Sequence, residues 1–87
     1  MWHEWTKENE DLLIECIASA IRNGRRISDG IIDAAAVLDR TPGSCEYRYY
    51  SRLRGSDDPR MDKVREAKRE RLQMRIATYH KDKGLIR

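Results

Sequence analysis

The chain has 87 residues, of which 18 are basic and 15 acidic, so its net charge is +3. This length is typical of one small domain, and a hydrophobic content of 39% is too high for a disordered polypeptide. No apolar run approaches the roughly 20 residues that span a bilayer, and the first residues lack the features of a secretory signal. With only Cys16 and Cys45, no disulfide framework is expected. We therefore expect a cytoplasmic protein and exclude membrane-spanning, disulfide-knit and large-cleft enzyme classes.

The charges are unevenly distributed along the chain. Residues 1–39 carry four bases and eight acids, whereas residues 40–87 carry 14 bases and seven acids. A basic second part favours contact with a polyanion. Helices rich in Lys and Arg are also common as solvated surfaces, so charge alone leaves both interpretations open.

The first predicted helix begins after Thr6 and ends at Asn23-Gly24. Thr6 is a good N-cap residue, and carboxylates in the early turns offset the positive end of the helix. The expected inner face contains Leu13, Ile17, Ala20 and Ile21. Asn-Gly is a typical C-terminal signal, so we expect a loop over residues 24–27.

Two shorter helices are predicted next. One begins at the N-cap pair Ser28-Asp29 and runs to about residue 38. Its expected inner residues are Ile31, Ala35 and Leu38. The next begins at Thr41-Pro42, where a proline costs little in the first turn, and ends at Gly55. Its expected inner residues, at successive i+4 steps, are Cys45, Tyr49 and Leu53.

A break at residues 56–59 separates these helices from a last one that extends to about Lys83, with Gly84 as its expected end. Its apolar residues approximate a stripe: Met61, Val64, Leu72, Ile76 and Tyr79. Lys68 falls within this stripe, and the pattern is no strict heptad. We expect the helix to pack on the bundle, or to pair with a second copy as a homodimer, through apolar residues near its C-terminal end.

No alternating apolar run or hairpin turn indicates a strand. The predicted fold class is therefore all-α, with a three-helix domain over residues 1–55 and a charged C-terminal helical extension over residues 56–87. Short helices joined by loops of a few residues form a compact bundle.

Two motifs carry a family resemblance. Residues 40–49 read Arg-Thr-Pro-Gly-Ser-Cys-Glu-Tyr-Arg-Tyr, and Trp5-Thr6-Lys7-Glu8 opens the first helix. They resemble the Myb/SANT repeat, in which Arg-Thr is followed by Cys or Ile and then Arg-Trp, and whose start reads Trp-Thr-x-Glu-Glu-Asp. Tyr49 stands for the usual Trp. The resemblance is strongest to RsfA-type prespore-specific regulators of spore-forming bacteria, whose Ile-Arg-Glu-Gly turn corresponds to residues 21–24, and it covers about residues 5–54.

The resemblance implies a Myb-like helix-turn-helix fold and a bacterial or phage DNA-binding transcription regulator associated with the nucleoid. The helix over residues 42–54 would lie in the major groove of double-stranded DNA, and the basic loop and tail would contact phosphates. The candidate DNA-binding residues are Arg25, Arg26, Gly43, Ser44, Glu46, Tyr47, Tyr50, Arg52 and Arg54.

Three of these positions depart from the family pattern. DNA-reading Myb repeats have a Lys, an Asn and a second Asn where this chain has Glu46, Tyr47 and Tyr50. Glu46 can accept a hydrogen bond from cytosine N4, but it also repels phosphate. The tyrosines can contact thymine methyl groups or donate from their hydroxyls. The resemblance therefore implies which positions would contact bases, but the side chains at these positions differ from those of the family.

Other interpretations stay open. A SANT-like protein-interaction module would bind a protein partner through the acidic first helix (Glu8, Asp11, Glu15) or through the C-terminal helix. A third possibility is a structural dimerisation unit built on residues 59–83. Arg48 pairs with an acid of the first helix or contacts DNA. No catalytic group or cofactor is expected, and His3 and His80 lack partners at the spacing of a metal site.

Overall fold

The computed structural model describes residues 4–82, with side chains described for residues 4–77. This part of the chain is helical and contains no strand, so the all-α prediction is confirmed. The elements are α1 (Lys7–Arg22), α2 (Ile27–Leu38), α3 (Pro42–Arg48), a π-helical turn (Tyr49–Leu53), a 3₁₀ turn (Pro59–Met61) and α4 (Asp62–Asp82).

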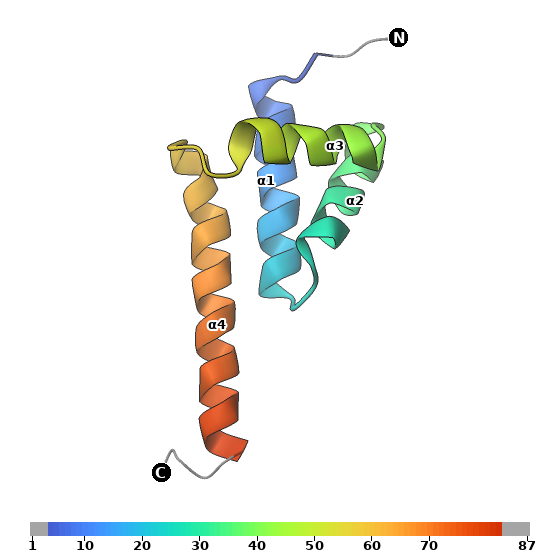
Figure 1. The fold of residues 1–87 in the computed structure, drawn as a ribbon. Helices are drawn as coiled ribbons and strands as arrows, with labels where there is room; N and C mark the ends of the chain where they lie inside the picture. The colour runs from blue at the N-terminus through green and yellow to red at the C-terminus, as the bar shows by residue number, and fades with distance from the viewer. Residues whose placement is uncertain (1–3, 83–87) are drawn as a thin grey trace.

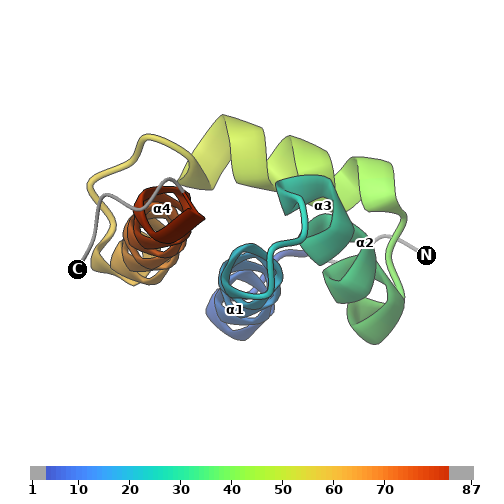
Figure 2. The same ribbon diagram turned by 90° about the horizontal axis from the view of Figure 1, so that it is seen from below.

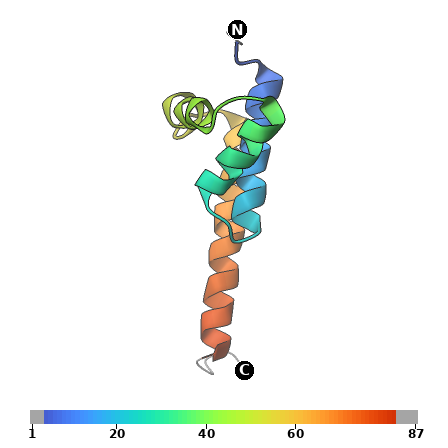
Figure 3. The ribbon, with the colours of Figure 1, turned by 90° about the vertical axis from the view of Figure 1, so that its right-hand side faces the viewer.

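The central element is α1, which lies between α2 and α4 (Figures 1 and 2). Helices α1 and α4 lie side by side and run in the same direction, as their ion pairs show: Glu15 with Lys63, then Arg22 with Glu70. Helix α3 crosses near the N-terminal ends of both and lies to one side of them (Figures 1 and 3). One face of α3 thus meets the bundle, and the other is left uncovered.

The helix ends follow mostly local chemistry. The Thr6 hydroxyl accepts a hydrogen bond from the backbone N–H of Asn9 (3.1 Å), which confirms the predicted cap of α1. The Thr41 hydroxyl accepts from the N–H of Ser44 in the same way, again as predicted. The predicted cap at Ser28-Asp29 is wrong. The N-cap of α2 is Arg26, because the Asp29 carboxylate lies in the first turn and accepts from the N–H of Arg26 (3.0 Å).

One hydrophobic core connects all four α-helices. Its buried members are Leu13, Ile14, Ile17, Ala18, Ile21, Ile31, Ala34, Ala35, Cys45, Tyr49, Leu53, Met61, Val64 and Ala67. The inner faces predicted for the first and third helices are confirmed, and in α2 Leu38 is only half-buried. Because three core members follow residue 56, the predicted division at residue 55 does not separate two cores.

The π-helical turn continues α3 and keeps its last apolar residue in the core. The N–H of Arg54 donates to the carbonyl oxygen of Tyr49, five residues earlier (2.8 Å). A π turn rotates the chain less per residue than an α-helix does. Leu53 is therefore brought back to the face of Cys45 and Tyr49, where it is 2% exposed.

Helix α4 packs on α1 through a different set of residues from the one predicted. Met61, Val64 and Ala67 in its first turns are buried, whereas Leu72 and Ile76 are exposed. The side chain of Tyr79 lies outside the described part of the chain. The predicted packing of Leu72 and Ile76 on the bundle is therefore wrong, and pairing of this helix with a second copy stays a prediction. The physical reason is length, because α4 extends past the end of α1 (Figure 1) and its later turns have no helix beside them.

The molecule is consequently elongated, with extents of 58 × 25 × 17 Å. None of the helices in the described range combines the length and the apolar character required to cross a bilayer.

Helices α1 and α2 approach each other closely at Gly30. A Cβ atom at this position would lie 2.7 Å from the carbonyl oxygen of Cys16 and 2.7 Å from the Cα of Ile17. Both atoms belong to the backbone of α1, so relief requires the helices to separate. Gly30 thus allows the close packing that buries Ala34 and Ile17.

We predict that Gly30→Ala lowers the free energy of unfolding by about 1–3 kcal/mol, the usual cost of overpacking. Urea unfolding followed by circular dichroism measures this. Gly43→Ala is the matched control, because nothing lies within 4 Å of its Cβ position, and a helical Ala is favoured over Gly by up to about 1 kcal/mol. Equal stability of the wild type and Gly30→Ala would contradict the described helix contact.

Candidate nucleic-acid interface

The outer face of α3 and its π-helical turn presents two aromatic side chains to solvent. Tyr47 is 73% exposed and Tyr50 is 44% exposed, and Glu46 is exposed beside them. They lie opposite Cys45 and Tyr49, which the core buries. Exposed tyrosines on a short helix form a surface that can stack on, or donate hydrogen bonds to, a partner.

Tyr50 is held in place by its neighbours. Its ring meets Tyr49 edge to face, with 5.1 Å between ring centroids, and the Arg54 guanidinium lies 5.3 Å from its centroid. Arg52 and Arg54 are exposed, and neither forms an ion pair within the described range. These two cations remain available to an anionic partner at the C-terminal end of the outer face.

The N-terminal end of this face offers a partner mainly Gly43, because Ser44 is partly covered. Gly43 is exposed, and the space around its Cα is open. Ser44 is half-buried, and its backbone N–H already donates to the Thr41 hydroxyl (3.1 Å). The structure thus brings seven of the nine predicted residues together on α3, its π-helical turn and the residue that follows this turn: Gly43, Ser44, Glu46, Tyr47, Tyr50, Arg52 and Arg54.

The other two predicted residues lie elsewhere. Arg25 and Arg26 belong to the connection between α1 and α2, at the opposite end of α2 from α3 (Figure 1). Arg25 is also engaged, because its guanidinium contacts the Asp33 carboxylate at 2.7 and 3.4 Å. The sequence could not show this separation. It follows from the length of α2, which places Arg25 and Arg26 at one end and α3 at the other.

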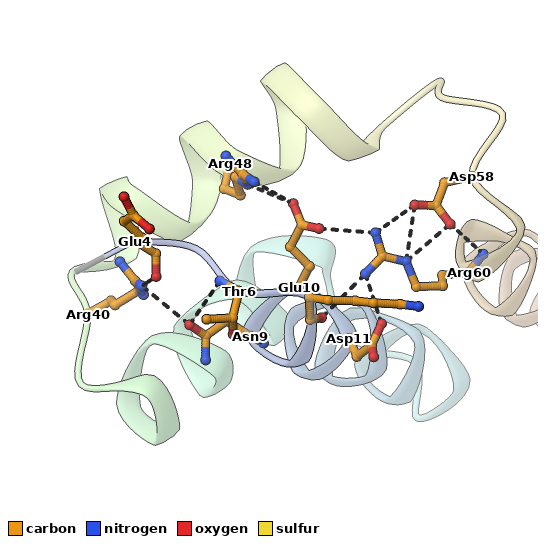
Figure 4. Close-up of polar contacts among 10 residues, drawn as sticks. Glu4, Thr6, Asn9, Glu10, Asp11, Arg40, Arg48, Asp58 and Arg60 are labelled. Atoms are coloured by element: carbon orange, nitrogen blue, oxygen red, sulfur yellow. Dashed lines mark hydrogen bonds and ion pairs between the residues drawn. The ribbon is translucent and has the colours of Figure 1, made fainter.

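A network of charged side chains lies behind α3 (Figure 4). At its centre, one oxygen of Glu10 accepts from Arg48 at 2.8 Å and the other from Arg60 at 3.0 Å. The Glu10 side chain is only 13% exposed. Of the two roles considered for Arg48, the structure therefore shows the ion pair with the first helix, and Arg48 anchors α3 to α1.

Arg60 is the residue of this network that sequence reasoning missed. Its guanidinium also contacts Asp11 at 2.9 Å and Asp58 at 2.6 Å. These hydrogen bonds raise the pKa of Arg60, Asp58 contributing most. No local signal could reveal it, because Arg60 lies 49 positions after Asp11 and only the packing of α4 on α1 brings them together.

Trp5 connects the chain before α1 to α3. It is half-buried and packs against the core, as expected for a core aromatic, and the Arg40 guanidinium lies 4.3 Å from its ring centroid. Arg40 also donates to the carbonyl oxygen of Glu4 (2.9 Å). The first residue of the Arg-Thr motif thus has a structural contact of its own.

The acidic face of α1 is partly occupied. Asp11 pairs with Arg60 and Glu15 pairs with Lys63 (2.8 Å), so both are neutralised by residues that follow the break at 56–59. Glu8 remains exposed. This face therefore has fewer charges for a basic partner than its sequence indicates.

The described residues contain no group of three ligands that could hold a metal ion. His3 and the side chain of His80 lie outside that range. In comparisons with protein-family models, curated proteins and solved structures, nothing matches this chain.

The network makes a prediction about acid stability. The hydrogen bonds from Arg60 lower the pKa of Asp58 from 3.8 to about 2. A carboxyl group whose pKa is lower in the folded than in the unfolded chain stabilises the fold at pH values above its pKa in the unfolded chain. This stabilisation disappears as the pH falls through the pKa of the group in the folded chain. Asp58 therefore adds stability in full above about pH 5, and loses it between about pH 4 and pH 2.

We expect Asp58→Asn, which retains capping ability, to be less stable than the wild type near neutral pH, with the difference vanishing towards about pH 2. Denaturant unfolding across this pH range measures it. Asp57→Asn is the control, because Asp57 is exposed and, in the part of the chain that is described, forms no ion pair. A difference for Asp58→Asn that does not vary with pH would contradict the pairing with Arg60.

Proposed function

We propose that the protein is a DNA-binding transcription regulator of Myb-like type, in which the three helices α1–α3 form a helix-turn-helix unit and α3 enters the major groove. The observation that carries the proposal is the uncovered outer face of α3 with its exposed aromatic and basic residues. Helix α4 lies beside α1 and leaves this face free (Figure 2).

The connection between α2 and α3 supports the assignment. It consists of residues 39–41, and Asp39 adopts a left-handed conformation with φ of 54°. Helix-turn-helix units join their helices through turns of 3–4 residues. The buried residues Cys45 and Tyr49 then hold α3 against the bundle, while the opposite face is presented outward.

The outer face has the chemistry for a duplex, with one exception. Tyr47 and Tyr50 can pack against thymine methyl groups or donate to base edges. Arg52 and Arg54 can pair with phosphates, which position the protein without reading sequence. The exception is Glu46, whose carboxylate favours a cytosine amino group and opposes phosphate. We assign no DNA contact to Arg48, because Glu10 already holds it.

A second candidate function is favoured by one observation. Leu72 and Ile76, four residues apart on one face of α4, are 55% and 46% exposed. Exposed apolar side chains on a helix indicate contact with another protein. In that case α4, rather than the neutralised face of α1, would carry a protein-interaction module.

We predict that Tyr47→Ala weakens binding to duplex DNA without loss of stability, because its side chain is outside the core. Tyr49→Ala is the matched comparison on the same helix. It removes a buried aromatic at a cost of about 3–5 kcal/mol, enough to unfold most of a small domain. Fluorescence anisotropy and thermal unfolding measure the two properties. A stable Tyr49→Ala protein would show that the faces of α3 are wrongly assigned.

We further predict that Glu46→Lys tightens non-specific duplex binding and steepens the dependence of log affinity on log salt by about one unit, because one phosphate repulsion becomes one attraction. If Glu46 reads a cytosine, specific binding falls by about 1–3 kcal/mol at the same time. Binding to pooled random duplexes at two salt concentrations measures both. Unchanged affinity for both kinds of duplex would remove α3 from the interface.

A further inference from the structure

The face of α4 that packs on α1 changes its character along the helix. Val64 and Ala67 on this face are buried against α1. The same face continues, at steps of three and four residues, through Lys68, Arg71 and Arg75. We call these three residues the basic stripe. It begins beside the last turn of α1, where Arg22 pairs with Glu70, and continues past the end of α1. The face is therefore apolar beside most of α1 and cationic from its last turn onward.

The stripe has no acidic partner within the described part of the chain. Lys68, Arg71 and Arg75 form no ion pair or hydrogen bond with another described residue. Arg71 lies against the turn after α1, since a Cβ atom on Gly24 would be 2.7 Å from its guanidinium. The bases of the network behave differently, because Arg48, Arg60 and Lys63 are all paired. Arg48, Arg60 and Lys63 are thus neutralised within the protein, whereas the stripe is unpaired among the described residues.

We propose that the basic stripe is a second nucleic-acid contact, separate from α3, and that one protein molecule binds two segments of duplex DNA. This inference rests on the proposed function, because it assigns the same class of ligand to a second surface. Guanidinium groups pair with phosphate through two parallel hydrogen bonds, and two of the three bases are arginines.

The geometry separates the two contacts. The outer face of α3 points away from the bundle, because its opposite face is buried against it. The stripe points toward the side on which α1 lies, because Val64 and Ala67 on the same face are buried there. It is also displaced along α4 toward the end of α1, where Arg22 pairs with Glu70, whereas α3 crosses near the start of α1 (Figure 1). A straight duplex held on α3 therefore does not reach the stripe.

Other partners fit this stripe less well. A second copy would set like charges against one another. A membrane surface requires the apolar side chains on one helix face, but Leu72 and Met74 fall on opposite flanks of the stripe. A protein interface requires an apolar or aromatic anchor at its centre, and the centre of this stripe is charged. A phosphate backbone needs only the charges.

The test uses the full chain and two variants of equal charge. K68Q/R75Q removes one Lys and one Arg from the stripe and leaves Arg71 in its contact with the turn. K7Q/R69Q removes one Lys from α1 and one Arg from another face of α4. All four residues are exposed, and neither Lys7 nor Arg69 forms an ion pair within the described range. An immobilised random-sequence duplex and a fluorescent one are mixed with each protein, and the captured fluorescence is measured. Anisotropy on the fluorescent duplex alone reports single-duplex binding.

We expect the wild type and K7Q/R69Q to capture similar amounts of the second duplex. K68Q/R75Q should capture about five-fold less or lower still, because two phosphate contacts of the second site are lost. Its residual single-duplex binding should still depend on Tyr47. Sedimentation of the free proteins should give monomers for all three.

Five results would overturn the proposal. Single-duplex binding without capture by the wild type would remove the second contact and leave the proposed function intact. Equal loss in both variants would show a general charge effect. A wild-type dimer that K68Q/R75Q dissociates would make the stripe an interface between copies. The wild type and K68Q/R75Q would also be compared for binding to polyglutamate and to duplex at one ionic strength. If K68Q/R75Q loses as much affinity for polyglutamate as for duplex, the partner would be an acidic protein. Absence of any duplex binding would overturn the proposed function together with this inference.

Discussion

Glu10 lies between the guanidinium groups of Arg48 and Arg60, which come from distant parts of the chain. One carboxylate oxygen of Glu10 accepts a hydrogen bond from Arg48, and the other accepts one from Arg60. Arg48 belongs to α3 and Arg60 to the turn before α4, so one side chain of α1 sets the position of both. With only 13% of that side chain exposed, its charge is mostly withdrawn from water. The largely buried carboxylate of Glu10 is tolerated because it is paired with arginines. Removal of one member of this network leaves the remaining charges without compensation.

This arrangement explains why α4 does not obstruct α3. Arg60 and Lys63 draw the start of α4 onto the acidic side of α1, where Met61 and Val64 complete the core. Helix α2 occupies the other side of α1, as close as Gly30 allows. With both sides of α1 covered, α3 crosses on a third side, and its outer face stays open to solvent (Figure 2).

The bases of residues 40–87 consequently have two different uses. One group is paired within the chain and includes Arg48, Arg60 and Lys63. The other is unpaired within the described range and includes Arg52 and the basic stripe. The net charge of residues 40–87 therefore overestimates the number of bases that a polyanion could contact, although several bases stay unpaired within the described range. The unpaired bases lie in two separate places, at the end of α3 and along α4.

Much of the local structure was determined by the sequence itself. Thr6 and Thr41 cap helices as predicted, and Cys45, Tyr49 and Leu53 fill the core from the predicted face. These features depend on residues three or four positions apart, which contact each other in any helix. For the same reason, the outward placement of Tyr47 and Glu46 followed from the pattern alone.

Only the tertiary structure decided which charges meet and which apolar residues are covered. The pairing of Arg60 with Asp11 depends on the packing of α4 on α1, and the separation of Arg25 from α3 depends on the length of α2. The exposure of Leu72 depends on where α1 ends beside α4. A helical pattern indicates that a face is apolar, but it does not indicate where the neighbouring helix ends. Burial and ion pairing each require two surfaces that contact one another. A single stretch of sequence contains only one of these two surfaces.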